Sequence, residues 1–270
     1  TGKLHPAILY AAGRTGVQRI YKIGGVQAIA AMAYGTETIS RVDKILGPGN
    51  QYVTCAKQLI QQEGVAIDMP AGPSELVVYA DATAVPAFAA ADLLSQCEHG
   101  PDSQVMLVTG NKKMAEEVIR EIGLQIPALP RKEIAVRALE NSRAIIIGDR
   151  EEAMEFVNAY APEHLILACK NALELASAVQ HAGSVFIGNF SPETAGDYAS
   201  GTNHTLPTNG YARAYSGVSV DSFITKISFQ QITPNGLSGI GETLMEMARA
   251  EGLQAHAAAV ELRLKRIKNN

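Results

Sequence analysis

Residues 75–188 alternate short apolar segments of β type with longer segments of helical periodicity. We expect strands at 75–80, 104–110, 143–148, 164–168 and 184–188, and helices between them at 84–99, 111–122, 151–160 and 172–181. Strands that alternate with helices are typical of βαβ units, in which helices cover both faces of a mostly parallel sheet. This part of the chain is therefore predicted to have an α/β fold.

A second, smaller α/β unit is predicted before this block. Its expected strands are 19–23, 43–47 and 65–68, and its expected helices are 5–13, 25–34 and 50–62. Both units resemble the Rossmann type of parallel α/β sheet.

The pattern changes again near the C-terminus. One strand is expected at 223–230, followed by helices at 236–250 and 252–268. So short a segment has little core of its own, so we expect it to pack on the rest of the chain or on another subunit. The predicted division is a smaller α/β domain at 1–73, a main α/β domain at 74–218 and a helical tail at 219–270.

The composition excludes several classes of function. The chain has 270 residues, a net charge of -4, 47% hydrophobic and 19% charged residues, which is ordinary for a soluble globular protein. No apolar run approaches the ~18 residues that cross a bilayer. Basic residues cluster only in the C-terminal RLKRIK, which argues against nucleic-acid binding. Three cysteines without a CxxC pair predict no disulfide framework and agree with a reducing cytoplasm.

The segment SQCEHGPDSQ, residues 95–104, lies at the end of a predicted helix that Gly100 and Pro101 terminate. On such a helix Gln96 and His99 lie about 60° apart on one face, whereas Cys97 points about 160° away from His99. Gln96 and His99 are thus candidates for a metal or a polar ligand, and Cys97 is expected to pack in the core. The alternative is a capping histidine beside a surface amide.

Two further segments carry acid and base side chains. Glu163 and His164, in YAPEHLIL, precede an apolar strand, and an adjacent carboxylate and imidazole suit two different proton transfers. In open α/β sheets catalytic groups gather at the carboxyl ends of strands, so their place before a strand weakens this interpretation. An exposed pair at a strand entrance is the alternative.

The segment 188–208 reads as a long loop with Asp197 and His204 in its interior, and such loops are usually functional. Asp197 is a candidate cation ligand, and a solvated surface loop is the alternative. EGLQAH places Glu251 and His256 near the start of the last helix, where an ordinary surface pair is the alternative.

Two turns rich in glycine and proline follow strand-like segments, ILGPGNQYV and AIDMPAGPSEL. Their backbone N–H groups suit a phosphate. Neither matches GxGxxG, and GIGETL at 239–244 lacks the third glycine. A nucleotide is therefore permitted, although no standard fingerprint indicates one.

Several of these segments together resemble the histidinol dehydrogenase family, in the same order and over essentially the whole chain. They are GGVQAIAAMAYGTE, VDKILGPGN, AIDMPAGPSE, DLLSQCEHGPDSQV, PEHLI, SPETAGDYASGTNHTLPT and EGLQAH. Members of that family oxidise L-histidinol to L-histidine, the last step of histidine biosynthesis, through an enzyme-held aldehyde, with two NAD in succession and one zinc ion per site. The family is longer, and this chain corresponds to about its C-terminal three-fifths.

The resemblance implies roles for individual residues. It implies Glu163 and His164 as the catalytic pair, and Gln27 and Asn50 as contacts to NAD. It implies that Zn2+ is bound by Gln96, His99, Asp197 and His256. The implied substrate contacts are Ser74, Gln96, His99, His164, Asp197, Glu251 and His256.

The resemblance also implies a homodimer in which the helical tail of one subunit reaches the active site of its partner. Glu251 and His256 are then supplied in trans. It further implies that the main domain lacks its N-terminal part, which leaves part of one sheet missing. A zinc-dependent hydrolase, and a fragment that binds zinc and substrate without turnover, remain the alternative functions.

Overall fold

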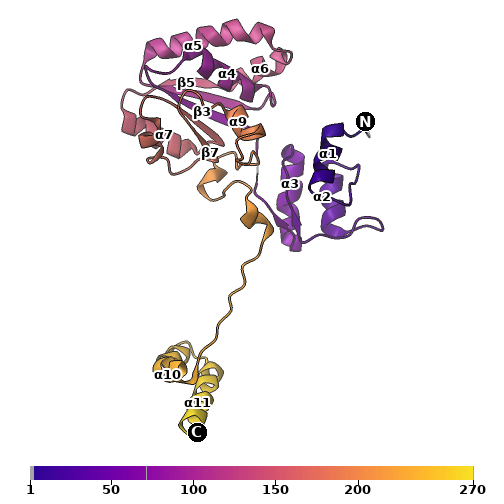
Figure 1. Ribbon diagram of the computed structural model, residues 1–270, viewed down its shortest axis with the longest axis vertical. Coiled ribbons are helices and arrows are strands. Elements are labelled where there is room, and N and C mark those ends of the chain that lie inside the picture. The colour runs from indigo at the N-terminus through magenta and orange to yellow at the C-terminus, as the bar shows by residue number, and fades with distance from the viewer. Residues whose placement is uncertain (1–2, 71, 270) are drawn as a thin grey trace. The chain divides into compact units, whose positions relative to one another are not determined.

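The computed structural model describes residues 3–70 and 72–269, in two compact units whose boundary along the chain lies between Phe223 and Ile224. The predicted boundaries at residues 73 and 218 remain a prediction. The α/β fold with parallel sheets is confirmed, and Figure 1 shows its elements.

The main sheet has five parallel strands in the order β5-β4-β3-β6-β7. They are β3 (Glu75–Ala80), β4 (Gln104–Thr109), β5 (Arg143–Ile146), β6 (His164–Ala168) and β7 (Ser184–Ile187). Every residue of β3 and β6 is buried, as expected for central strands covered on both faces. Leu76 pairs with His164, and His164 pairs with Ser184, so the amino ends of β3, β6 and β7 lie together.

Helices cover the two faces of this sheet, and α4, α5 and α6 lie on the opposite side from α7 (Figure 1). The helices are α4 (Pro86–Cys97), α5 (Lys112–Gln125), α6 (Lys132–Glu140), α7 (Arg150–Tyr160), α8 (Ala172–Ala176) and α9 (Glu193–Tyr198). Alternation along β3 divides the core: Leu76 and Val78 pack with α4, α5 and α6, whereas Val77 and Tyr79 pack with α7 and α8.

A smaller core lies in the N-terminal part. Its elements are α1 (Pro6–Arg14), α2 (Gly25–Tyr34), β1 (Lys44–Ile45), α3 (Gln51–Ile60) and β2 (Ala66–Ile67). β1 and β2 pair in parallel, and Ile45, Ile60 and Val65 pack with α2 and α3.

The second unit contains α10 (Pro234–Ala250) and α11 (Gln254–Lys268), as expected for the tail. The two helices pack closely: a Cβ at Gly241 would lie 2.7 Å from Leu264 Cδ1. Among the described residues, no helix is long and apolar enough to span a bilayer.

Four predictions about local structure are wrong. Neither 19–23 nor 223–230 forms a strand within the described chain, because neither alternating segment has a partner strand. The segment 188–208 is not wholly irregular, since it contains α9. Helix α6 was not expected, because Pro127 and Pro130 interrupt the helical pattern before it.

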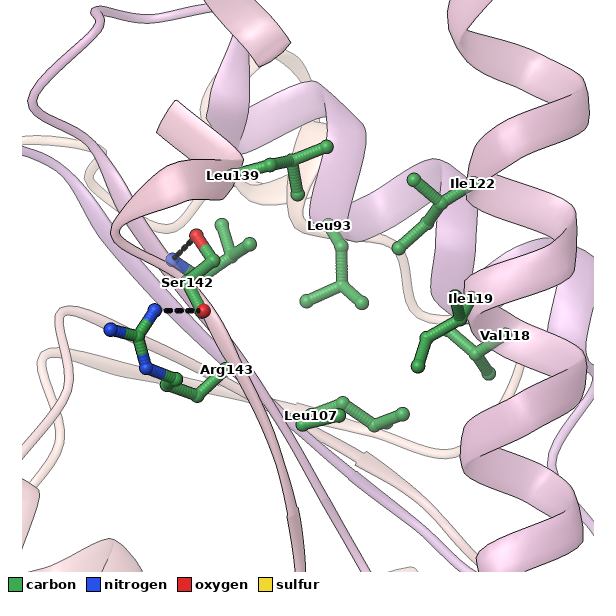
Figure 2. A pocket seen from close by; sticks show the side chains of 10 residues that line it. Leu93, Leu107, Val118, Ile119, Ile122, Leu139, Ser142 and Arg143 are labelled. Carbon is green, nitrogen blue, oxygen red and sulfur yellow. Dashed lines mark hydrogen bonds between the residues drawn. The ribbon is translucent and has the colours of Figure 1, made fainter. Parts of the chain in front are cut away.

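An apolar cavity of about 250 Å³ lies where α4, α5 and α6 meet β4 and β5. Figure 2 shows Leu93, Leu107 and Ile122 facing into it, with Ser142 and Arg143 at one side. Its lining carries none of the predicted site residues.

Candidate active site and metal centre

The predicted site residues of the main sheet gather at the amino ends of β3 and β6. Helix α4 follows β3 and returns toward its start, so the C-terminal end of α4, with Gln96 and His99, reaches the same edge as Glu163 and His164. Three polar contacts lie at this edge: Ser74 with His99, Glu163 with the Glu75 N–H, and His164 with the Glu75 oxygen. This edge is opposite to the carboxyl ends of the strands, where α/β sheets usually carry ligands.

Glu163 and His164 are held by the start of β3. Glu163 Oε2 accepts a hydrogen bond of 2.9 Å from the backbone N–H of Glu75, and His164 Nδ1 lies 3.3 Å from the backbone oxygen of Glu75. The exposed fractions are 7% for Glu163 and 2% for His164, so the alternative of an exposed pair is wrong. His164 Nδ1 also lies 3.6 Å from Glu163 Oε2.

The contact to the Glu75 oxygen fixes the tautomer of His164. A carbonyl oxygen only accepts hydrogen bonds, so Nδ1 carries the proton and Nε2 is the acceptor. Nε2 is buried and has no hydrogen-bond partner among the described residues. The ring therefore has a buried, unprotonated nitrogen that can accept a hydrogen bond.

Burial sets the protonation of Glu163 and His164. Desolvation lowers the pKa of His164 to about 4, so the imidazole is neutral at pH 7. Desolvation, helped by the nearby charges of Glu75 and Asp197, raises the pKa of Glu163 to about 8. A carboxyl group with a pKa near neutral pH is suited to general acid–base work.

The turn into β6 holds Glu163 tightly. Ala161 ends α7 in the left-handed conformation, and the backbone oxygen of Glu163 accepts a 2.9 Å bond from Ser184 N. A Cβ at Gly183 would lie 2.5 Å from that oxygen. Only glycine fits here without moving the backbone of Glu163.

A possible metal cluster lies beside this pair. In the part of the chain that the structure describes, His99, Glu193 and Asp197 each offer one ligand atom, and these atoms lie within 4.8 Å of one another. Gln96 joins them, because in the amide orientation that satisfies its neighbours its nitrogen donates to both carboxylate oxygens of Glu193. Imidazole and carboxylate ligands suit zinc.

The charge at this edge favours a cation. Glu75, Glu163 and Glu193 are all buried, and burial raises their pKa values to about 7, 8 and 9. The C-terminal end of α4 adds the partial negative charge of its free carbonyl groups. Such a cluster is costly unless protons or a metal ion compensate it.

The surroundings of Gln96 confirm part of the helix interpretation. Gln96 and Cys97 are both 0% exposed, so the alternative of a surface amide is wrong and Cys97 packs in the core as expected. His99 is exposed, and its Nδ1 lies 3.3 Å from Ser74 Oγ. A cavity of about 280 Å³ has Asn50, Ser74 and His99 in its lining.

Asn50 begins α3, and its side-chain oxygen accepts from Tyr52 N and Val53 N at 3.2 and 3.1 Å. Gln27 is exposed in the first turn of α2. Glu251 and His256 are exposed on the second unit. The roles of these four residues remain predictions.

Sequence reasoning missed Glu75 and Glu193. Glu75 Oε1 accepts a 3.0 Å bond from Asn209 N, and its buried Oε2 has no partner in the described residues. Its position at the start of a fully apolar strand was the available signal, since acidic residues are rarely buried. For Glu193 the signal was its i, i+4 spacing to Asp197.

Comparison with known proteins decides the family. The sequence profile of the histidinol dehydrogenase family matches residues 1–264. This chain belongs to the histidinol dehydrogenase family. The histidinol dehydrogenase of Bacteroides thetaiotaomicron is 62% identical over 267 residues, which are 99% of this chain and 62% of that protein. The histidinol dehydrogenase of Yersinia pestis is 52% identical over 97% of this chain and 60% of its own length.

A solved structure of the same family has the same fold as this chain. The crystal structure of histidinol dehydrogenase from Elizabethkingia anophelis matches with a TM-score of 0.97 and 58% identity, over 99% of this chain and 62% of that one. The chain thus spans about three-fifths of the length of the histidinol dehydrogenases that it matches.

Proposed function

We propose that this chain carries the active site of a zinc-requiring, NAD-dependent histidinol dehydrogenase, which oxidises L-histidinol to L-histidine through histidinaldehyde. One observation above all supports this proposal. A buried carboxyl–imidazole pair, Glu163 and His164, lies next to a group of metal-binding side chains at one edge of the sheet.

Zinc would be held by Gln96, His99 and Asp197, with His256 as the fourth ligand. The amide oxygen, the imidazole nitrogens and the carboxylate form a harder ligand set than the cysteines of structural zinc sites. When bound, zinc supplies a fixed positive charge that orients the imidazole and amine of the substrate. Ser74, beside His99, and Glu251 would add contacts to the substrate.

His164 acts as the base in the first oxidation. Its Nε2 is unprotonated and takes the proton of the substrate hydroxyl while the carbinol carbon loses a hydride. Gln27 and Asn50 would hold NAD, which would supply the acceptor for that hydride. General base help of this kind typically contributes ~10² to 10⁴ in rate.

Glu163 acts in the second oxidation. Because burial raises its pKa to about 8, Glu163 must first lose its own proton. The ionised carboxylate then removes a proton from the water that adds to the aldehyde carbon, and the hydrated aldehyde loses the second hydride. Its hydrogen bond from Glu75 N fixes one oxygen, which leaves the other to contact water. Each of the two steps thus has its own proton acceptor.

The tail is proposed to act in trans within a homodimer. Glu251 directly follows α10, and His256 lies in the first turn of α11. Both residues belong to the second unit, and both are exposed. Exposed polar side chains on a small helical pair are available to complete the site of a second subunit.

The test is NADH formation, followed by absorbance, with the 270-residue chain, zinc and L-histidinol. The proposal predicts growth that a chelator abolishes and zinc restores. Binding of zinc and histidinol without NADH would instead support a binding fragment, and zinc-dependent ester or amide cleavage without NADH would support a hydrolase. Either result would contradict the proposal.

A further inference from the structure

We propose that Glu193 is a positioning residue that orients the amide of Gln96 toward the metal ion. This inference rests on the proposed zinc site and deepens it. Glu193 is 2% exposed and Gln96 is 0% exposed, so their contact is shielded from water.

The contact fixes which end of the amide faces the metal. The nitrogen of Gln96 donates to both carboxylate oxygens of Glu193, at 3.0 Å from Oε2 and closer to Oε1. In its ionised form the carboxylate of Glu193 only accepts hydrogen bonds, so that form selects the amide nitrogen. The amide oxygen is then the atom that Gln96 presents to a cation. In the reversed orientation two oxygen atoms would face each other in a buried place, which is unfavourable.

The charge of Glu193 also strengthens the ligand. A carboxylate that accepts from the N–H of an amide polarises it and increases the negative charge on the amide oxygen. Partners of this kind, which hydrogen-bond to a ligand rather than to the metal, tune metal affinity. In the described chain the ion pairs of Glu193 include no lysine or arginine, and His164 Nδ1, at 3.9 Å, belongs to a neutral imidazole.

Local structure places Glu193 where this role needs it. It is the first residue of α9, and Asp197 lies four residues later on the same face of that helix. α9 approaches the sheet closely at Gly196, where a Cβ would lie 2.7 Å from the ring of Phe186. One short helix thus supplies a metal ligand and the residue that orients a second ligand from α4.

The experiment is a double-mutant cycle on zinc affinity, measured by competition with a chromophoric chelator in the full chain. Glu193→Leu removes the acceptor and should weaken zinc binding by about 10- to 100-fold. Glu193→Gln keeps an oxygen that accepts from Gln96 but loses the charge, so a smaller loss is expected. Glu98→Gln, on the same end of α4 but outside the cluster, should leave the affinity unchanged.

The cycle separates an indirect role from direct ligation. In a Gln96→Leu background, Glu193→Leu should change the zinc affinity less than about threefold, because its effect passes through Gln96. A full additional loss would show that Glu193 acts without Gln96 and would overturn the inference. So would an unchanged affinity for Glu193→Leu in the parent chain.

Circular dichroism of the metal-free variants checks that they fold. A variant that unfolds is replaced by Glu193→Gln, whose shape is unchanged, and the same cycle is measured with it. If the parent chain itself binds no zinc, the proposed metal site fails and the inference with it. If the parent binds zinc and the cycle is additive, only the inference fails.

Discussion

Individual residues at the amino ends of β3 and β6 have protonation states set by burial. His164 is neutral because its charged form would lose hydration, and Glu163 holds its proton to higher pH for the same reason. The two effects keep a base and an acid side by side at neutral pH. Their backbone partner, Glu75, is a residue whose own carboxyl is buried.

Substitutions of the two proposed catalytic residues are expected to impair different steps. His164→Asn should lose mainly the oxidation of histidinol, because it removes the base for the hydroxyl proton, by about 10²- to 10⁴-fold. Glu163→Gln should lose mainly the oxidation of supplied histidinaldehyde, by a similar factor. Single-turnover assays with each substrate measure this division, and equal turnover of the aldehyde by Glu163→Gln and the parent would refute it.

Glu163 also makes the stability of the metal-free chain depend on pH. Its folded-state pKa of about 8 lies above the ordinary 4.5, so the folded state holds the proton longer than the unfolded state. Its contribution to stability is therefore complete below about pH 4.5 and is lost as the pH rises toward 8. Glu163→Gln should match the parent near pH 4.5 and exceed it increasingly up to pH 8, by on the order of 1 kcal/mol per pKa unit.

Urea unfolding at a series of pH values, with zinc removed, measures this difference. A constant gap between Glu163→Gln and the parent across the pH range would mean that Glu163 does not titrate as described.

The buried ion pair of Lys57 and Asp68 holds the turn that carries Asn50. Lys57 Nζ donates to Asp68 Oδ1 and, at 2.8 Å, to the oxygen of Gly47, whose N–H donates to Asp68 Oδ2 at 2.7 Å. Lys57→Met leaves a carboxylate buried without its partner, and we expect a loss of about 3–5 kcal/mol in the free energy of unfolding.

Denaturant unfolding checks this value. The matched control is Lys113→Met, which removes an exposed pair with Glu117 and should cost no more than about 0.5 kcal/mol. Equal effects of the two substitutions would contradict the role of the Lys57 pair.

At the scale of elements, the site depends on how closely short segments approach the sheet. α9 has only six residues, so tertiary packing and not helix propensity holds it in place. Its closest approach is at Gly196, over the ring of Phe186, whose centroid lies 6.0 Å from that of His164. The position of α9 thus sets the positions of Glu193 and Asp197 relative to His164.

Gly196→Ala should therefore lower zinc affinity and activity more than it changes the stability of α9. The new methyl group would displace α9 from Phe186, so zinc affinity and activity should both fall by about tenfold or more. In contrast, Gly123→Ala in α5 meets open space and should stabilise the chain by roughly 0.5–1 kcal/mol with unchanged zinc affinity. Zinc competition and thermal unfolding of both variants test this contrast, and equal zinc affinity in Gly196→Ala would contradict it.

The elements of the main sheet could be predicted because their strands are continuous apolar runs bounded by turns. The site could be predicted only in part. Helical spacing indicated Gln96 and His99, and it relates Glu193 to Asp197, but spacing does not reveal that the carboxyl group of Glu193 is buried. The segments 19–23 and 223–230 have strand-like alternation, yet pairing depends on a partner strand, which a local pattern does not reveal.

At the scale of the whole molecule, the account places one site across two chains. If the tail acts in trans, two inactive variants complement each other: His164→Asn lacks the base, and His256→Leu lacks the tail ligand. Their heterodimer contains one site with neither change, so an equal mixture, unfolded and refolded together, should recover about a quarter of the parent activity. Refolded single variants are the controls, and a mixture as inactive as they are would contradict a site shared between subunits.

The central claim is that the edge formed by β3, β6, α4 and α9 carries out two successive oxidations on one bound substrate. The most direct measurement is the number of NADH molecules formed for each L-histidinol consumed by the zinc-loaded chain. The account predicts two, with L-histidine as the product. One NADH with free histidinaldehyde, or none despite bound zinc and substrate, would contradict it.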